Sequence, residues 1–238
     1  MSRLILVRHG QARAFEQDSD RLTERGMEQA LRLGQYFAAR GMRFDEVYSG
    51  TLERQKRTLL LISNAYRDAR LPWPTIRLIP GWNEYDSAGV LRHLQPALAA
   101  RDPAFAQLVH AAAAHRQTPD ANRHFQPMFE TLLNRWIAGG LEHPDVETWT
   151  SFRARVETAL RRILNAEGPS RNVLVVTSGG PIATAVQTVL EAPPRMALEL
   201  NWRMRNASIT EFLFTKGRVT LDLFNAAPHL EQDFVTYR

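Results

Sequence analysis

An apolar run near the start of the chain leads directly into an arginine, a histidine and a glycine: Leu4-Ile5-Leu6-Val7-Arg8-His9-Gly10-Gln11. The apolar part is too short for a helix and is rich in strand-forming residues, so we predict a buried strand over Arg3–Val7. Ligands of open α/β sheets bind outside the carboxyl ends of the strands. Arg8 and His9 therefore stand where a ligand is expected, although a triplet of this kind also occurs by chance.

Strands and helices alternate along most of the remaining chain. We predict further strands over Asp45–Ser49, Thr75–Ile79 and Asn172–Thr177, and a closing hairpin over Ser208–Phe214 and Arg218–Phe224. We predict helices over Thr23–Arg40, Thr51–Arg67, Thr150–Ala166 and Pro181–Leu190. Such alternation is typical of the α/β class, in which helices cover both faces of a sheet. The expected fold is a three-layer α/β/α sandwich with a mixed, mostly parallel sheet.

The segment from Gly89 to Asp145 lacks a strand pattern. Helices are predicted there over Leu91–Ala100, Pro103–Arg116 and Gln126–Ala138, separated by turns that contain proline. We interpret residues 89–145 as a helical cap inserted into a single domain over residues 1–238, where it would bound the substrate pocket. The aromatic residues of the cap, Phe125, Phe129 and Trp136, are expected to form its own small core rather than to recognise a substrate.

Composition excludes several classes of function. The 238 residues include no cysteine, so disulfides, thiolate metal sites and cysteine nucleophiles are excluded. The net charge is +5, and the positively charged residues are almost all arginine. They are spread along the chain, which argues against a nucleic-acid partner but would favour anionic substrates. No apolar run is long enough for a membrane span, and the first apolar stretch is too short for a signal peptide. We therefore expect a cytoplasmic protein without membrane or nucleic-acid partners; its oligomeric state is not predicted.

Further short motifs follow the Arg8-His9-Gly10 triplet in order. They are Leu22-Thr23-Glu24-Arg25-Gly26, Gln29-Ala30-x-x-x-Gly34, Val47-Tyr48-Ser49-Gly50-Thr51-Leu52-Glu53-Arg54 with Thr58, Asn83-Glu84-Tyr85, Arg155-Val156, Val175-Val176-Thr177-Ser178-Gly179-Gly180, and Asn206-Ala207-Ser208-Ile209. In this order they resemble the motifs of the histidine phosphatase (phosphoglycerate-mutase-like) superfamily. The resemblance covers essentially the whole chain outside residues 89–145, and ordered agreement at several sites is far more specific than one motif.

The resemblance implies a phosphomonoester hydrolase that acts through a phosphohistidine. His9 is the expected nucleophile, because a neutral imidazole has a lone pair that can attack phosphorus. Arg8 and Arg54 offer permanently charged, planar donors for the phosphoryl oxygens, and such charge stabilisation is the main task in phosphoryl transfer. Glu84, if protonated, would give the leaving oxygen its proton and later activate water. The substrate is expected to be a small phosphorylated molecule.

One position departs from the family pattern in a way that bears on catalysis. The fourth motif normally has a second histidine that contacts the phosphate, and here the residue is Ser178. A serine hydroxyl donates a neutral hydrogen bond and is shorter, so a water could fill the difference, and catalysis is expected to be slower rather than absent. Gly179 begins a helix whose free N–H groups favour an anion. Gln11, where a glutamate is frequent, completes the expected phosphate-binding set.

Three alternatives follow from these departures. Ser178 could be a nucleophile on a strand-to-helix turn, but the elbow pattern needs glycine two residues earlier, where Val176 stands. The chain could be a pseudo-phosphatase that binds phospholigands or partners without turnover. It could also be a phosphotransferase of the phosphoglycerate mutase type, although it lacks the polar tail and the polar insertion that mutases use. We expect Ser178→His to raise the rate if Ser178 is a weakened phosphate contact, and to lower it if the pocket is reshaped around serine.

No cofactor and no metal are expected. The remaining histidines show no metal-ligand spacing beside paired carboxylates and are expected to be surface or structural residues. They are His93, His110, His115, His124, His143 and His229.

Overall fold

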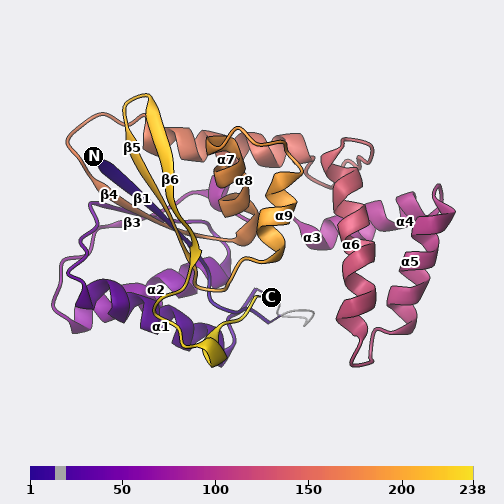
Figure 1. The fold of residues 1–238 in the computed structure, drawn as a ribbon, viewed down its shortest axis with the longest axis horizontal. Coiled ribbons are helices and arrows are strands. Elements are labelled where there is room, and N and C mark those ends of the chain that lie inside the picture. Colours follow the sequence, from indigo (N-terminus) through magenta and orange to yellow (C-terminus); the bar gives the residue numbers. More distant parts are fainter. Residues whose placement is uncertain (14–19, 238) are drawn as a thin grey trace. The chain divides into compact units, whose positions relative to one another are not determined.

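A computed structural model describes residues 1–13 and 20–237 (Figure 1). The described residues form a six-stranded sheet in the order β3-β2-β4-β1-β5-β6. Its strands are β1 (Ser2–Arg8), β2 (Glu46–Ser49), β3 (Ile76–Leu78), β4 (Asn172–Thr177), β5 (Ile209–Thr215) and β6 (Arg218–Ala226). Strands β1 to β4 run parallel, whereas β5 and β6 form an antiparallel hairpin beside β1. The expected mixed, mostly parallel α/β sheet is confirmed.

Helices connect the strands. They are α1 (Glu24–Ala39), α2 (Glu53–Asp68), α3 (Ser87–Gly89), α4 (Gln95–Ala99), α5 (Pro103–Ala114), α6 (Ala121–Ile137), α7 (Trp149–Leu164), α8 (Gly179–Val189) and α9 (Met196–Trp202). Short 3₁₀ turns lie at Pro80–Trp82 and Gln232–Phe234, and a π-helical turn lies at Val90–Leu94. Each helix and strand predicted from the sequence is present, with ends that differ by a few residues, and the single helix expected over Leu91–Ala100 is a π-helical turn followed by α4. Helix α9 was not predicted.

The chain divides into two compact units. One consists of Met1–Glu84 together with Arg155–Arg238 and contains the whole sheet, and the other is Tyr85–Ala154. The second unit holds the helices expected between residues 89 and 145, but it begins and ends several residues outside that range. That this segment acts as a cap over a substrate pocket stays a prediction.

The strand alternation of β1 serves both faces of the sheet. Ile5 and Val7 join a buried cluster with Leu33 of α1 and Ile62 of α2, so these two helices cover one face. Leu4 and Leu6, which are also fully buried, point to the opposite face because successive side chains of a strand alternate. Helices α8 and α9 lie on that side (Figure 1).

The register between β1 and β4 decides where the site forms. The two strands are parallel and pair Arg8 with Thr177, so His9 and Ser178 follow at the same edge of the sheet. The main-chain N–H of His9 donates to the carbonyl of Thr177 at 2.9 Å, which extends the pairing by one residue. The two positions lie 169 residues apart in sequence, and the sheet brings them together.

Within the second unit, aromatic side chains form a cluster of their own. The ring of Trp136 lies 5.2 Å from that of Tyr85 and 5.5 Å from that of Trp149, centroid to centroid. Trp136 and Phe129 are 2% and 1% exposed, and the indole N–H of Trp136 donates to the carbonyl of Glu147 at 3.0 Å. Aromatic residues of this segment are therefore committed to packing, as expected for Trp136 and Phe129.

None of the helices that the structure describes has the length and apolar character required to cross a membrane.

His229 makes the stability of the chain sensitive to acid. Burial, aided by the charge of Arg32, lowers the pKa of His229 to about 4, and neither ring nitrogen has a hydrogen-bond partner among the described residues. The unfolded chain takes up this proton near pH 6.5, but the folded chain does not until about pH 4. Stability contributed by neutral His229 is therefore complete above pH 6.5 and is lost as the pH falls toward 4.

We expect His229→Gln to reduce the loss in the free energy of unfolding between pH 7 and pH 5 by about 1–2 kcal/mol. Urea denaturation at the two pH values measures the difference. His110→Gln is the control, because His110 is exposed. Equal acid sensitivity of wild type and His229→Gln would contradict this expectation.

Candidate active site

His9 lies at the carboxyl end of β1 and is 6% exposed. Its Nδ1 is 2.7 Å from the carbonyl oxygen of Gly10, and its Nε2 is 3.1 Å from Nε of Arg54. A carbonyl can only accept a hydrogen bond and an arginine nitrogen can only donate one. These two contacts therefore assign the proton to Nδ1 and the lone pair to Nε2.

The surroundings of His9 favour the neutral ring. Burial, then the charges of Arg54 and Arg8, hold the pKa of His9 well below its usual value, while the hydrogen bond to Gly10 acts in the opposite direction. Imidazolium has no lone pair, so a lowered pKa keeps the nucleophilic form populated at neutral and mildly acidic pH. The expected chemical state of His9 is thus supported by position, hydrogen bonding and charge.

Arg54 is held at the start of α2 by a second group. Its Nη1 lies 2.7 Å from Oδ1 of Asp20, while Oδ2 of Asp20 accepts a 2.8 Å hydrogen bond from the main-chain N–H of Glu53. The carboxylate of Asp20 therefore lies at the N-terminus of α2, where an anion is favoured, and it also orients the guanidinium beside His9. Nothing in the sequence analysis identified Asp20, which is directly next to a segment outside the described residues.

Arg8 is buried, with 8% exposure, and its Nη1 donates to main-chain carbonyls of Met204 and Tyr237. Nη1 therefore binds two segments that are distant in sequence from β1. The charge of Arg8 still contributes, after burial and Arg54, to the lowered pKa of His9. Nη1 is thus occupied by these carbonyls, and a part for Arg8 in phosphate binding stays a prediction.

Glu84 reaches the beginning of α8. Its Oε2 accepts a 3.0 Å hydrogen bond from the main-chain N–H of Gly180, two residues after Ser178. Arg155 fixes the segment that carries Glu84, because its guanidinium donates to the carbonyls of Asn83 at 2.7 Å and of Glu84 at 3.3 Å. The structure therefore brings Glu84 to the start of α8, close to Ser178, and its part as a proton donor stays a prediction.

Ser178 and Gly179 form the turn between β4 and α8. Ser178 is fully buried, and its Oγ lies 2.8 Å from Nε2 of Gln55, the residue after Arg54. A Cβ built on Gly179 would lie 2.1 Å from Oδ1 of Asn201 and 3.7 Å from Nε of Arg8, so this turn passes close to Arg8. The hydroxyl of Ser178 is thus bordered by a glutamine that was not predicted, and a water beside the serine stays a prediction.

Gln11 is oriented toward helix α1. Its Oε1 accepts a 3.1 Å hydrogen bond from Oγ1 of Thr23, the residue that caps α1, and its main-chain N–H donates to Gln29. These contacts hold the loop after His9 against α1. A part for Gln11 in phosphate binding stays a prediction.

Two residues of the site, Asp20 and Gln55, escaped the sequence analysis. Each is polar and lies within two residues of a motif, which is a weak signal. The contact of Asp20 with Arg54 spans 34 positions and that of Gln55 with Ser178 spans 123. Contacts at such separations require the sheet and helices to be placed first.

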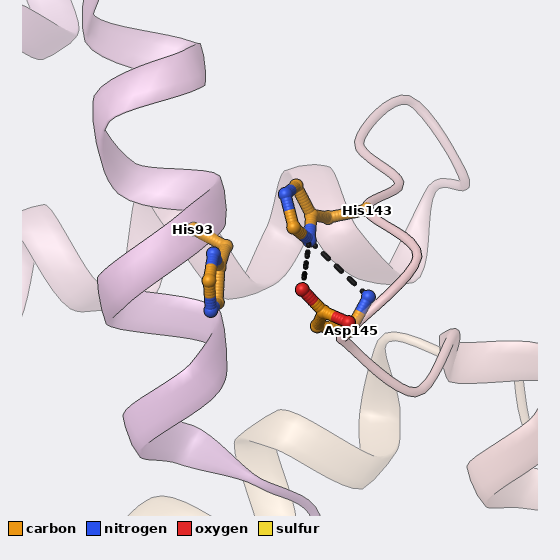
Figure 2. Close-up of side chains that lie close together, drawn as sticks. All are labelled: His93, His143 and Asp145. Atoms are coloured by element: carbon orange, nitrogen blue, oxygen red, sulfur yellow. Dashed lines mark hydrogen bonds and ion pairs between the residues drawn. The ribbon is translucent and has the colours of Figure 1, made fainter.

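A second cluster of candidate ligands lies in the unit Tyr85–Ala154 (Figure 2). The ligand atoms of His93, His143 and Asp145 all lie within 4.8 Å of one another, and the main-chain N–H of Asp145 donates to Nδ1 of His143 at 3.2 Å. Two imidazoles and a carboxylate suit zinc by type. However, the two rings stack with centroids 4.3 Å apart and planes at 22°. Because imidazole lone pairs lie in the ring plane, near-parallel rings cannot bind one ion unless one of them turns.

Comparison with solved structures supports the fold. Matches include Bacillus stearothermophilus YhfR (18% identity, TM-score 0.65, 97% of this chain and 100% of that chain covered). A phosphoserine phosphatase from Entamoeba histolytica in complex with 3-phosphoglyceric acid also matches (20%, TM-score 0.63, 97% and 100% covered). So does the alpha-ribazole phosphatase from Shigella flexneri (21%, TM-score 0.62, 94% and 96% covered). At these identities the likeness establishes a shared fold.

A search of curated proteins found no match. The family model described as histidine phosphatase superfamily (branch 1) matches residues 4–227, which include every motif that led to the sequence-based resemblance. The chain therefore belongs to the histidine phosphatase superfamily.

Proposed function

We propose that this protein hydrolyses small phosphomonoesters through a phosphohistidine formed on His9. The observation that carries the proposal is the contact between Nε2 of His9 and Nε of Arg54, because it joins the lone pair of a buried imidazole to a fixed positive charge. Membership of the superfamily and the phosphatase names of several solved structures with this fold support the same class of reaction.

The first step transfers the phosphoryl group to the protein. The lone pair on Nε2 of His9 attacks phosphorus in line with the ester oxygen, the new N–P bond forms, and the P–O bond breaks with its electrons on the leaving oxygen. A proton on the carboxyl group of Glu84 passes to that oxygen. The products are an alcohol, a phosphorylated His9 and the carboxylate of Glu84.

The second step returns the protein to its first state. The carboxylate of Glu84 takes a proton from water while the water oxygen attacks phosphorus. The N–P bond breaks and its electrons return to Nε2 of His9, which releases inorganic phosphate and leaves Glu84 protonated for another cycle. One carboxyl group therefore acts as an acid and then as a base.

Arg54 changes partner when the phosphate arrives. Its Nε–H points at the lone pair that must attack, so the hydrogen bond to His9 has to be exchanged for one to a phosphoryl oxygen. The exchange replaces a neutral acceptor with a charged one, and hydrogen bonds between charged groups are shorter and stronger. Asp20 stays bound to the other side of the guanidinium and limits its rotation.

The serine-nucleophile alternative finds no support in the contacts of Ser178. An attacking hydroxyl needs a base that can take its proton, as a histidine does in a catalytic triad. The partner of Ser178 Oγ is Nε2 of Gln55, which is an amide donor and has no lone pair for a proton. The pseudo-phosphatase alternative keeps one specific point in its favour, the uncharged serine at this position.

Trapping of the covalent intermediate tests the proposal. We expect the purified protein to hydrolyse a generic aryl phosphate with EDTA present, and samples quenched in denaturant at alkaline pH to carry one phosphoryl group on the peptide that contains His9. Mass spectrometry of the peptides measures this. Measurable binding of phosphate esters without turnover would instead support the pseudo-phosphatase, and a phosphorylated peptide around Ser178 would support a serine nucleophile.

A further inference from the structure

Gln55 has no place in the reaction described above, yet its carboxamide is fully buried beside Ser178. Its Nε2 lies 2.8 Å from Oγ of Ser178 and 3.1 Å from the main-chain carbonyl oxygen of Trp82. Its Oε1 accepts from the main-chain N–H of Leu52 at 3.4 Å. The side chain thus connects the start of α2, the segment before Glu84, and the turn between β4 and α8.

The contacts fix which way the amide points. Nitrogen and oxygen of a glutamine look alike, so the assignment has to come from the partners. The carbonyl of Trp82 can only accept and the N–H of Leu52 can only donate, so nitrogen faces Trp82 and oxygen faces Leu52. The second hydrogen of Nε2 is then directed at Ser178, whose oxygen must accept it.

A hydroxyl whose oxygen accepts one hydrogen bond still has a proton to donate. No described residue accepts the hydroxyl proton of Ser178, although the side chain is fully buried. A buried polar hydrogen without an acceptor is costly, and a phosphoryl oxygen bound beside His9 would satisfy it. We propose that Gln55 is a positioning residue that holds Ser178 Oγ as an acceptor, so that its proton can only be donated to the phosphoryl group. This rests on the proposed function.

The same geometry changes the expectation for a histidine at position 178. Oγ of Ser178 already lies 2.8 Å from Nε2 of Gln55, and both residues are fully buried. The larger imidazole of a histidine at position 178 would therefore meet the carboxamide of Gln55. We therefore expect Ser178→His to lower kcat/KM for an aryl phosphate, and expect Gln55→Ala added to it to recover part of the loss by making room. A gain in kcat/KM with Ser178→His alone would overturn the proposed pairing.

A double-mutant cycle tests whether Gln55 acts through Ser178. The variants are Gln55→Met, which keeps the length without the donor, Ser178→Ala, and the two together. We expect each single change to lower kcat for the aryl phosphate about tenfold with a smaller change in KM, because the bond is made to the reacting group. We expect kcat of the double variant to lie within about threefold of kcat of the less active single variant, since both changes remove the same interaction.

Gln29→Met is the matched control. Gln29 is equally buried and makes three hydrogen bonds, to Gln11, Phe234 and Thr236, but none to Ser178. Its effect should therefore multiply with that of Ser178→Ala. The melting temperature of each variant separates loss of packing from loss of positioning. If Gln55 had a purely structural role, Gln55→Met would lower the melting temperature equally with serine or alanine at position 178. Its effect on kcat would then multiply with that of Ser178→Ala.

The outcomes separate this inference from the proposed function. If kcat of the Gln55→Met, Ser178→Ala double variant falls about a hundredfold while phosphohistidine still forms on His9, the positioning role of Gln55 is overturned and the proposed function is not. If Gln55→Met does not fold, Gln55→Glu is the second test. It replaces the amide donor with a carboxylate oxygen, which would accept the hydroxyl proton of Ser178 in place of the phosphoryl group. We expect it to lower kcat with Ser178 present and to have no further effect with alanine there; an undiminished effect in the alanine background overturns the proposal.

Discussion

Replacing His9 with alanine is expected to reduce kcat for aryl phosphate hydrolysis by at least about 10³-fold, since the variant has no nucleophile to carry the phosphoryl group. The remaining arginines still favour an anion, so binding of inorganic phosphate should persist. Steady-state kinetics with EDTA present gives the first quantity and calorimetric titration gives the second.

Two comparisons make this result specific. For Ser178→Ala, kcat should stay within about a hundredfold of wild type, because this change removes one hydrogen bond and leaves the nucleophile His9 in place. A melting temperature close to that of wild type shows that the His9→Ala protein is folded. Hydrolysis by His9→Ala within tenfold of wild type would rule out a phosphohistidine on this residue, whatever the other variants do.

Gly26→Ala is expected to lower the free energy of unfolding by about 3–5 kcal/mol, because two main-chain segments touch at this glycine. A Cβ on Gly26 would lie 2.0 Å from the carbonyl oxygen of Gln11, and one on Gly10 would lie 2.1 Å from the carbonyl oxygen of Gly26. Main-chain atoms cannot move aside as the end of a flexible side chain can. The loop after His9 would have to separate from α1, and kcat should fall with stability.

Gly140→Ala is the control for this change. A Cβ there would meet its nearest atom, the carbonyl oxygen of Arg135, at 3.8 Å, which is ordinary van der Waals contact. Its effect should stay within about 0.5 kcal/mol. Chemical denaturation of both variants measures the pair, and equal stability of Gly26→Ala and Gly140→Ala would show that the close contact between the two segments is not required.

The fold followed from local patterns. The apolar run of residues 4–7 and strand β4 could be placed because each is short, apolar and bounded by polar residues, and β4 was predicted with the bounds that the structure gives it. Helix α9 was missed because Met196–Trp202 is short and follows two prolines without a clear apolar period. The order of the strands could not be predicted, since pairing depends on packing between distant segments.

The candidate site was predictable where a motif marks a strand end or a helix start, as at His9, Arg54 and Ser178. Hydrogen bonding was not. Arg8 looked like a free donor in the sequence, but part of its guanidinium serves the carbonyls of Met204 and Tyr237 near the other end of the chain. The partner of Ser178 was invisible for the same reason. Residue type shows which hydrogen bonds a side chain can donate, whereas the tertiary structure determines which group accepts them.

The position of β1 has a consequence for how the protein is made. Strand β1 lies between β4, which ends at Thr177, and β5, which ends at Thr215. During synthesis on the ribosome, Leu4 to Val7 must therefore wait without either permanent neighbour until most of the chain has emerged. Pairing across such sequence distances is slow, and an apolar strand without partners is prone to aggregate.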